Sequence, residues 1–155
     1  MKNIYVFDLD DTIIMHKKYN PLQYDKIQYN HKIDQFLSSL DGPKYIYTNG
    51  TYGHADKVLS KMNISNHFNI IYARDTLDYM KPDKDSFLQV YDDILYQENI
   101  NKKDSHNVYF YDDLLSNLNT AYHIGWNTIW IHPDYYNGYK YYFVDQSYRL
   151  LEDIN

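Results

Sequence analysis

The chain has 155 residues, a formal net charge of −6, no cysteine and 44% hydrophobic residues. A chain of this length can bury one complete core, so we expect a single domain over residues 1–155, without disulfides or cysteine-based zinc sites. The negative charge disfavours a polyanionic nucleic-acid partner without excluding one.

Short runs of β-forming residues alternate along the chain with amphipathic stretches of helical period. In chain order they predict strand 3–9, helix 31–40, strand 44–49, helix 54–62, strand 68–73, helix 83–97, strand 107–113, helix 114–125 and strand 127–132. This alternation is typical of an α/β fold, here a Rossmann-like three-layer sandwich with a mainly parallel sheet of about five strands and helices on both faces. Ligands of such sheets bind at the carboxyl ends of the strands.

Polar residues gather at the predicted carboxyl ends. The first strand runs straight into three acids, where burial and mutual repulsion both penalise the charges. If the ends converge, four carboxylates, one ammonium and one hydroxyl share a pocket, and such carboxylates need a compensating cation. Their hard oxygen atoms favour Mg²⁺. The residues concerned are Asp8, Asp10, Thr48, Lys81, Asp112 and Asp113.

Each of these motifs, taken separately, has an ordinary structural explanation. Asp and Thr cap helices, which suits Asp10-Asp11-Thr12 and Asp112-Asp113. Asn49-Gly50 is a typical turn pair, and Lys81-Pro82 is typical of a solvated loop before a helix. The combination favours a functional site. The seven histidines show no metal-ligand spacing, so we assign none of them to a metal.

The polar motifs resemble a known family. Asp8-Leu9-Asp10-Asp11-Thr12, then Thr48, Lys81 and Asp112-Asp113, in this order, resemble the four motifs of the haloacid dehalogenase superfamily, whose members are mostly Mg²⁺-dependent phosphatases. The resemblance spans residues 3 to about 132. The sequence around the second, third and fourth motifs looks most like the branch that contains pyrimidine 5′-nucleotidases.

The resemblance implies a catalytic role for each motif. Asp8 attacks phosphorus in line and forms an aspartyl-phosphate, while Asp10 protonates the leaving alkoxide and then takes a proton from the hydrolytic water. Thr48 and the backbone N–H groups around Asn49 bind phosphoryl oxygens. Lys81 neutralises the charge of the nucleophile and of the phosphate.

A magnesium site is also implied. Its ligands are an Asp8 oxygen, the backbone carbonyl of Asp10 and the Asp113 carboxylate, with Asp112 reaching the ion through water. Leu114 departs from the family pattern, since many relatives have a small hydroxyl residue there, and hydrogen bonding near the metal is therefore expected to differ.

The chain leaves little room for the cap domain that relatives acting on small metabolites usually carry. Residues 13–30 provide only a short flap, so we expect an open site, which suits a macromolecular substrate or closure by a second subunit. Tyr19, Tyr24, Tyr52 and His54 are either leaving-group contacts or ordinary surface residues. The tyrosine-rich segment 134–143 is read as edge packing, as a homodimer contact or as part of the site rim.

Three functions follow. The first is a Mg²⁺-dependent phosphomonoester hydrolase acting on a phosphorylated small molecule or macromolecule, and the second is a nucleotide-specific 5′-nucleotidase. The third is a catalytically silent binding module, against which the presence of Asp8, Asp10 and Lys81 argues. A dehalogenase is less favoured, because the second acid, Asp10, is a feature of the phosphoryl-transfer members.

The compartment is predicted from apolar runs. The run before Asp8 is too short for a signal peptide, and no stretch approaches the roughly 18 apolar residues of a membrane helix. We therefore expect a soluble, cytoplasmic protein that makes no membrane contact.

Overall fold

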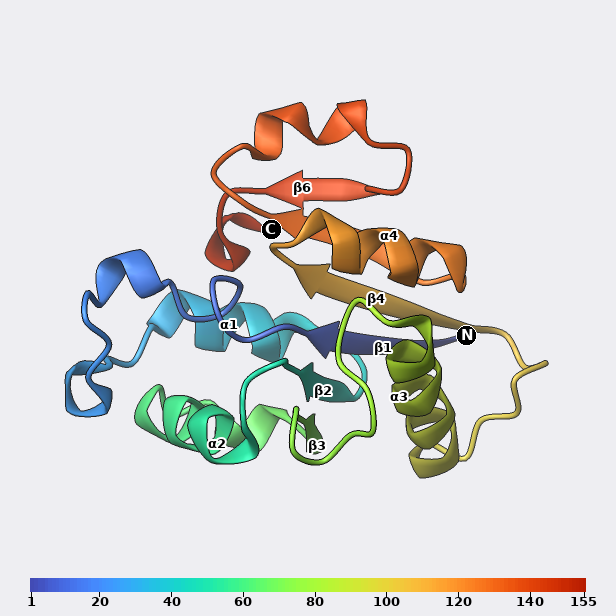
Figure 1. Cartoon of the computed structure of the whole chain (residues 1–155), viewed down its shortest axis with the longest axis horizontal. Coiled ribbons are helices and arrows are strands. Elements are labelled where there is room, and N and C mark those ends of the chain that lie inside the picture. Colours follow the sequence, from blue (N-terminus) through green and yellow to red (C-terminus); the bar gives the residue numbers. More distant parts are fainter.

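The central sheet has β1 (Lys2–Phe7) in its interior, where its apolar residues are buried on both faces. In the computed structural model, which describes residues 1–155, six strands lie in the order β3-β2-β1-β4-β5-β6, and every neighbouring pair is parallel (Figure 1). The other strands are β2 (Lys44–Tyr47), β3 (Ile70–Tyr72), β4 (His106–Asp112), β5 (Asn127–Ile131) and β6 (Gln146–Tyr148). The predicted fold class is confirmed.

Successive strands are added in opposite directions on the two sides of the boundary between β1 and β4. From β1 the chain builds outward through β2 and β3, then returns to place β4 beside β1 and continues through β5 to β6. A crevice at the carboxyl ends of the strands is the usual binding site at such a reversal. The strand arrows of Figure 1 point to the side of the molecule where the segment 13–30, in blue, lies.

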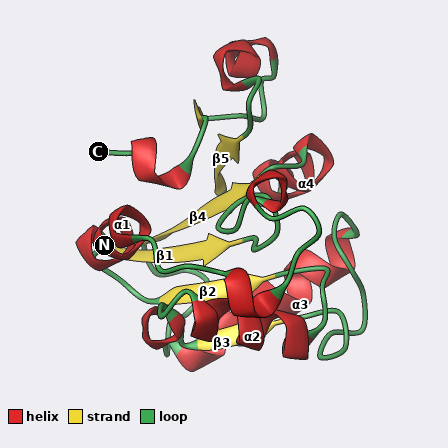
Figure 2. Ribbon diagram, turned by 90° about the vertical axis from the view of Figure 1, so that its left-hand side faces the viewer, coloured by secondary structure: helices red, strands yellow, loops and turns green.

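Helices cover both faces of the sheet. On one face α1 (His31–Ser39) and α2 (Tyr52–Lys61) pack against Phe7, Ile46 and other residues of one core cluster. On the other face α3 (Lys84–Gln97) and α4 (Leu115–His123) pack against a second cluster that contains Val6. The neighbours Val6 and Phe7 face opposite layers because side chains alternate along a strand. Figure 2 shows α1 and α4 on either side of the strands.

The sixth strand, β6, was not predicted. It has only three residues, Gln146–Tyr148, none of them buried, and it pairs along one edge with Ile129–Ile131 of β5. A short polar edge strand lacks the apolar run by which buried parallel strands are recognised, so its pairing depends on the tertiary fold.

The segment between β1 and α1 contains no domain-sized insertion. Residues 13–30 hold two short 3₁₀ helices, η1 (His16–Lys18) and η2 (Tyr24–Lys26). Ile13, Ile14 and Ile27 anchor this flap in the core. No helix of the protein combines the length and the apolar character needed to span a bilayer.

Candidate active site

A buried ammonium group lies at the carboxyl edge of the sheet. The loop between β3 and α3 carries Lys81, whose side chain is only 1% exposed. Its Nζ donates to Asp8 Oδ1 at 3.1 Å, to Asp112 Oδ2 at 2.9 Å and to the Tyr47 carbonyl at 2.8 Å. The interpretation of Lys81-Pro82 as a solvated loop is therefore wrong for the lysine, which joins three strand ends.

Lys81 is held in place by Asn49. The Asn49 Nδ2 donates to the Lys81 carbonyl and the Lys81 N–H donates to Asn49 Oδ1, both at 3.0 Å. Burial alone lowers the pKa of Lys81, but the carboxylates of Asp112 and Asp8 outweigh burial and raise that pKa above its ordinary value. The Asn49 side chain thus positions Lys81, and the Asn49 backbone N–H, which has no protein acceptor, is available for the predicted phosphate contact.

Three carboxylates crowd together beside this ammonium. One oxygen from each of Asp8, Asp112 and Asp113 lies within 4.8 Å of the others. Burial, reinforced by the charge of Asp112, raises the pKa of Asp8 to about 6. Burial and the nearby Asp8 and Asp112 raise the pKa of Asp113 to about 9. One lysine does not balance two buried acids and a third that is half-buried, and a divalent cation among these hard oxygen donors fits the charge and the ligand chemistry.

Asp112 is fully engaged with protein donors. It is completely buried, its Oδ1 accepts the Leu114 N–H at 2.8 Å, and its Oδ2 accepts Asn117 Nδ2 at 3.0 Å in addition to Lys81. Helix α4 has Leu114 at its N-cap and no side-chain cap, so the capping explanation of Asp112-Asp113 is wrong. Asp112 instead accepts the N–H of Leu114 and holds Lys81. Asp113 shares a side-chain hydrogen bond with Asp8, which contributes to its raised pKa, and a metal ion between the two carboxylates would take the place of the shared proton. The Leu114 side chain is exposed.

The nucleophile candidate, Asp8, is fixed on both sides. Its N–H donates to the Tyr111 carbonyl at 2.9 Å, and its Oδ2 accepts the buried Thr12 hydroxyl at 3.1 Å. No helix begins here. Instead a turn closes through Asp11 N–H to the Ile14 carbonyl at 2.7 Å, with Asp11 in the left-handed region at φ 59°. The capping explanation of Asp10-Asp11-Thr12 is therefore wrong.

Asp10 occupies a separate and more open position. Its side chain is 32% exposed, and its Oδ1 accepts from His16 Nε2 at 2.6 Å and from His54 Nε2 at 2.9 Å. A methyl group built on Gly50 would lie 3.5 Å from Asp10 Oδ2 and 3.3 Å from Thr48 Oγ1. The carboxylate and the hydroxyl thus border one small space, which a residue larger than glycine would narrow.

Backbone donors line the same region. The N–H groups of Leu9, Asp10 and Asn49 donate to no protein acceptor. Thr48 Oγ1 accepts the Gly50 N–H at 3.0 Å, which leaves the hydroxyl proton free to donate. Donors that have no protein acceptor, such as these N–H groups and the Thr48 hydroxyl, can bind the oxygens of an anion beside Lys81.

A cavity of about 440 Å³ adjoins these groups on the side of Asp113. It lies between the flap, the end of β5 and the C-terminal segment. Its polar lining mixes charges of both signs: Asp11, Lys17, Asp113, His132 and Arg149.

Two partners of the site, Asn117 and His16, were missed in the sequence, whereas His54 was considered as a leaving-group contact or a surface residue. All three contact the predicted acids, and only the path of the chain brings them there. Of the aromatic residues considered for the leaving group, Tyr24 bonds to His54 Nδ1 at 2.8 Å. Tyr19 accepts the Gln28 N–H within the flap, and Tyr52 lies on the surface.

A family model for haloacid dehalogenase-like hydrolases matches residues 15–131. L-2-haloacid dehalogenase from Xanthobacter autotrophicus superposes with a TM-score of 0.70 at 11% identity, covering 99% of this chain and 97% of that chain. YfnB from Bacillus subtilis, assigned as a HAD-hydrolase and bound to magnesium, gives 0.69 at 16% identity, covering 99% and 96%. A core domain from Streptococcus pneumoniae TIGR4, assigned as a phosphoglycolate phosphatase, gives 0.64 at 17%, covering 99% and 93%.

At these identities the structural likeness concerns the fold alone. A comparison with curated proteins finds no match. The region matched by the family model takes in Thr48, Lys81 and Asp112-Asp113, while Asp8 and Asp10 lie directly before it. The matched region makes up most of the chain, and the chain belongs to the family of haloacid dehalogenase-like hydrolases.

Proposed function

We propose that this protein is a Mg²⁺-dependent phosphomonoester hydrolase that works through an aspartyl-phosphate. The observation that carries the proposal is the pairing of two different acids around one anion site. Asp8 is buried and bonded to Lys81, whereas Asp10 is half-exposed and faces Thr48 across Gly50. A nucleophile and a separate acid–base group are the two carboxylates that this reaction needs.

Asp8 performs the covalent step. A carboxylate oxygen of Asp8 attacks phosphorus, the bond from phosphorus to the ester oxygen breaks, and Asp10 gives its proton to the departing alkoxide. Water then attacks the aspartyl-phosphate, Asp10 takes the water proton, and the bond between phosphorus and Asp8 breaks to release phosphate. Lys81 and the free N–H groups of Asn49 and Leu9 bind the phosphoryl oxygens throughout.

The metal would be held by Asp8, Asp113 and the Asp10 carbonyl, with Asp112 beyond a water molecule. When bound, Mg²⁺ supplies positive charge that offsets the carboxylates and the phosphoryl group. Asp112 keeps Lys81 and the start of α4 in position, and its saturated oxygens suit this indirect role.

The flap bears on the choice of substrate. With residues 13–30 in place of a cap and Asp10 32% exposed, the reacting centre is open on the leaving-group side. We infer a single domain over residues 1–155 that accepts phosphate esters whose remaining part lies outside the site.

The test is hydrolysis of p-nitrophenyl phosphate and of a panel of nucleotides, sugar phosphates and phosphopeptides, with Mg²⁺ or with EDTA. We expect metal-dependent release, lost by at least ~10³-fold in Asp8→Asn. Asp92→Asn, an exposed acid far from the site, is the matched control. A preference for nucleoside monophosphates would identify a nucleotidase. No turnover of any substrate despite Mg²⁺ binding would overturn the proposal in favour of a binding module.

A further inference from the structure

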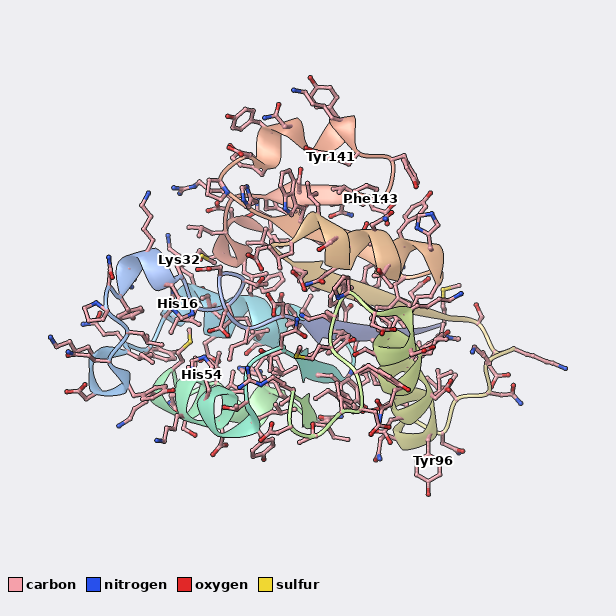
Figure 3. All side chains as sticks on the ribbon, viewed as in Figure 1. His16, Lys32, His54, Tyr96, Tyr141 and Phe143 are labelled. Atoms are coloured by element: carbon pink, nitrogen blue, oxygen red, sulfur yellow. The ribbon has the colours of Figure 1, made fainter.

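We propose that Asp10, His16 and His54 form a second metal site, selective for Zn²⁺-like ions, which is distinct from the magnesium site. The sequence gives no hint of it, because the three residues do not follow a ligand spacing. The structure brings one ligand atom from each within 4.8 Å of the others. Figure 3 labels the two histidines, one on the flap and one on the first turn of α2.

The ligand atoms converge on one point. His16 Nε2 and His54 Nε2 lie 2.6 Å and 2.9 Å from the same oxygen, Asp10 Oδ1. The two rings are 6.5 Å apart between centroids, with their planes inclined by 19°. Tetrahedral ligands placed 2.0–2.1 Å from Zn²⁺ stand about 3.3 Å from each other. The two separations would therefore have to lengthen by about 0.7 Å and about 0.4 Å to admit the ion, which small side-chain rotations supply.

The surroundings of His54 suit a metal ligand. Its Nδ1 lies 2.8 Å from the Tyr24 hydroxyl, and Tyr24 also carries Lys57 over its ring at 5.2 Å. When Nε2 binds a metal, the ring proton sits on Nδ1 and is donated to the Tyr24 oxygen. Metal-binding histidines generally have such an oxygen partner on the other ring nitrogen, because it fixes the tautomer and the ring orientation.

The positions of the ligands are also set by the backbone. His16 is placed by its own N–H, which donates to Asp11 Oδ1 at 3.0 Å. His54 is placed by Thr51, whose hydroxyl caps α2 by accepting the His54 N–H at 3.2 Å. Each ligand thus comes from a different element: the β1 loop, the flap and α2. An ion bound here would tie the flap to the body of the protein.

Ligand chemistry separates this site from the magnesium site. Asp8, Asp112 and Asp113 offer oxygen alone, which suits Mg²⁺. Two imidazoles and one carboxylate favour Zn²⁺, Co²⁺ or Ni²⁺, and Mg²⁺ competes poorly for such nitrogen donors. Excess Mg²⁺ should therefore fill the first site and leave the second to the other ions.

One consequence rests on the proposed function. A metal on the Asp10 carboxylate would occupy the group proposed to transfer protons, so Zn²⁺ would inhibit hydrolysis. The inhibition would come from the loss of the acid–base group, with the magnesium site still filled.

The direct test needs no activity. Co²⁺ is titrated into the metal-free protein in excess Mg²⁺, and its visible d–d absorption is recorded, with Zn²⁺ calorimetry in parallel. We expect one Co²⁺ per chain in the wild type, no such absorption in His16→Ala or His54→Ala, and about 10–100-fold weaker binding in Tyr24→Phe. His123→Ala, which removes an exposed histidine of α4, should bind as the wild type does.

The possible outcomes are separable. Absence of the absorption in the wild type, or equal absorption in His16→Ala, overturns the site. His16 lies on the flap surface, so His16→Ala keeps the test valid even if His54→Ala does not fold. Each variant's hydrolysis with Zn²⁺ is compared with its own zinc-free rate. Cobalt binding without any hydrolysis would contradict the proposed function and support the second metal site. Hydrolysis that is insensitive to Zn²⁺ in a protein that binds Co²⁺ would overturn the inhibitory role.

Discussion

The two acid centres of this protein are built in opposite ways. At the buried centre, Lys81 is 1% exposed and is surrounded by carboxylates that accept from several protein donors. At the open centre, Asp10 is 32% exposed and contacts two imidazole rings, that of His16 on the flap and that of His54 on α2. The buried centre holds its charged groups in fixed contacts, and the open centre leaves a carboxylate free to change partners. A nucleophile needs the first environment, and a group that moves protons needs the second.

The largest effect should come from removing the lysine of the buried centre. Lys81→Met leaves Asp8 and Asp112 as neighbouring buried acids without their cation, and we expect a loss of about 3–5 kcal/mol in the free energy of unfolding. Urea denaturation in EDTA measures it. Lys84→Met, on the exposed start of α3, is the control. An unchanged midpoint in Lys81→Met would mean that the ammonium is not what stabilises this centre.

The second-largest effects on stability should come from pH and from metal binding at the buried centre. The folded pKa values of about 6 for Asp8 and about 9 for Asp113 lie above the ordinary 3.8, so the folded protein holds protons that the unfolded chain has released. In EDTA, stability should therefore fall as pH rises from about 4 to about 9. Mg²⁺ at about 100 times its Kd should add about 2.7 kcal/mol, with a larger gain at pH 8 than at pH 5.

Asp113→Asn separates the contributions to this behaviour. It should flatten the upper part of the pH dependence in EDTA and remove most of the stabilisation by Mg²⁺, as read from thermal melts. A melting temperature that rises with pH in EDTA would contradict the raised pKa of Asp113.

A smaller loss of stability is expected when a hydrogen-bond donor to Asp112 is removed. Asn117→Ala removes one donor from a completely buried carboxylate, which should cost about 1–3 kcal/mol. Asn119→Ala, on the same helix, removes an amide whose oxygen has no partner, and it should cost less. Equal losses for the two variants in urea would show that the contact of Asn117 with Asp112 adds nothing.

The smallest effect is expected at the open centre. Tyr24→Phe breaks one hydrogen bond between the flap and His54, and we expect a loss of about 0.5–1.5 kcal/mol, with faster amide exchange confined to the flap. Tyr96→Phe changes an exposed tyrosine of α3 and serves as control. Protection factors in residues 13–30 that match the wild type would show that the hydroxyl does not restrain the flap.

The same contrast explains what the sequence made predictable. Buried parallel strands have continuous apolar runs, and polar residues directly after them lie at the carboxyl edge of the sheet, so the placement of Asp8, Thr48 and Asp112 could be predicted. Lys81 was predicted for the site, although its motif alone is typical of a solvated loop.

The partners of these residues could not be predicted in the same way. His16 reaches Asp10 only because Asp11 takes a left-handed turn that redirects the flap. Asn117 reaches Asp112 through the first turn of α4. Such contacts depend on the path of loops, and β6 depends on its pairing with β5, so none of the three leaves a periodic signal in the sequence.

The reciprocal pairing of Asn49 with Lys81 has a consequence for motion. Two hydrogen bonds of 3.0 Å join the loop after β2 to the loop before α3, so these loops should move as one rigid body. The free N–H of Asn49 and the ammonium of Lys81 then keep their spacing whatever the rest of the protein does. Any motion that accompanies ligand entry and exit should accordingly be confined to residues 13–30, and NMR relaxation should find slow exchange there while both loops remain as stiff as the sheet.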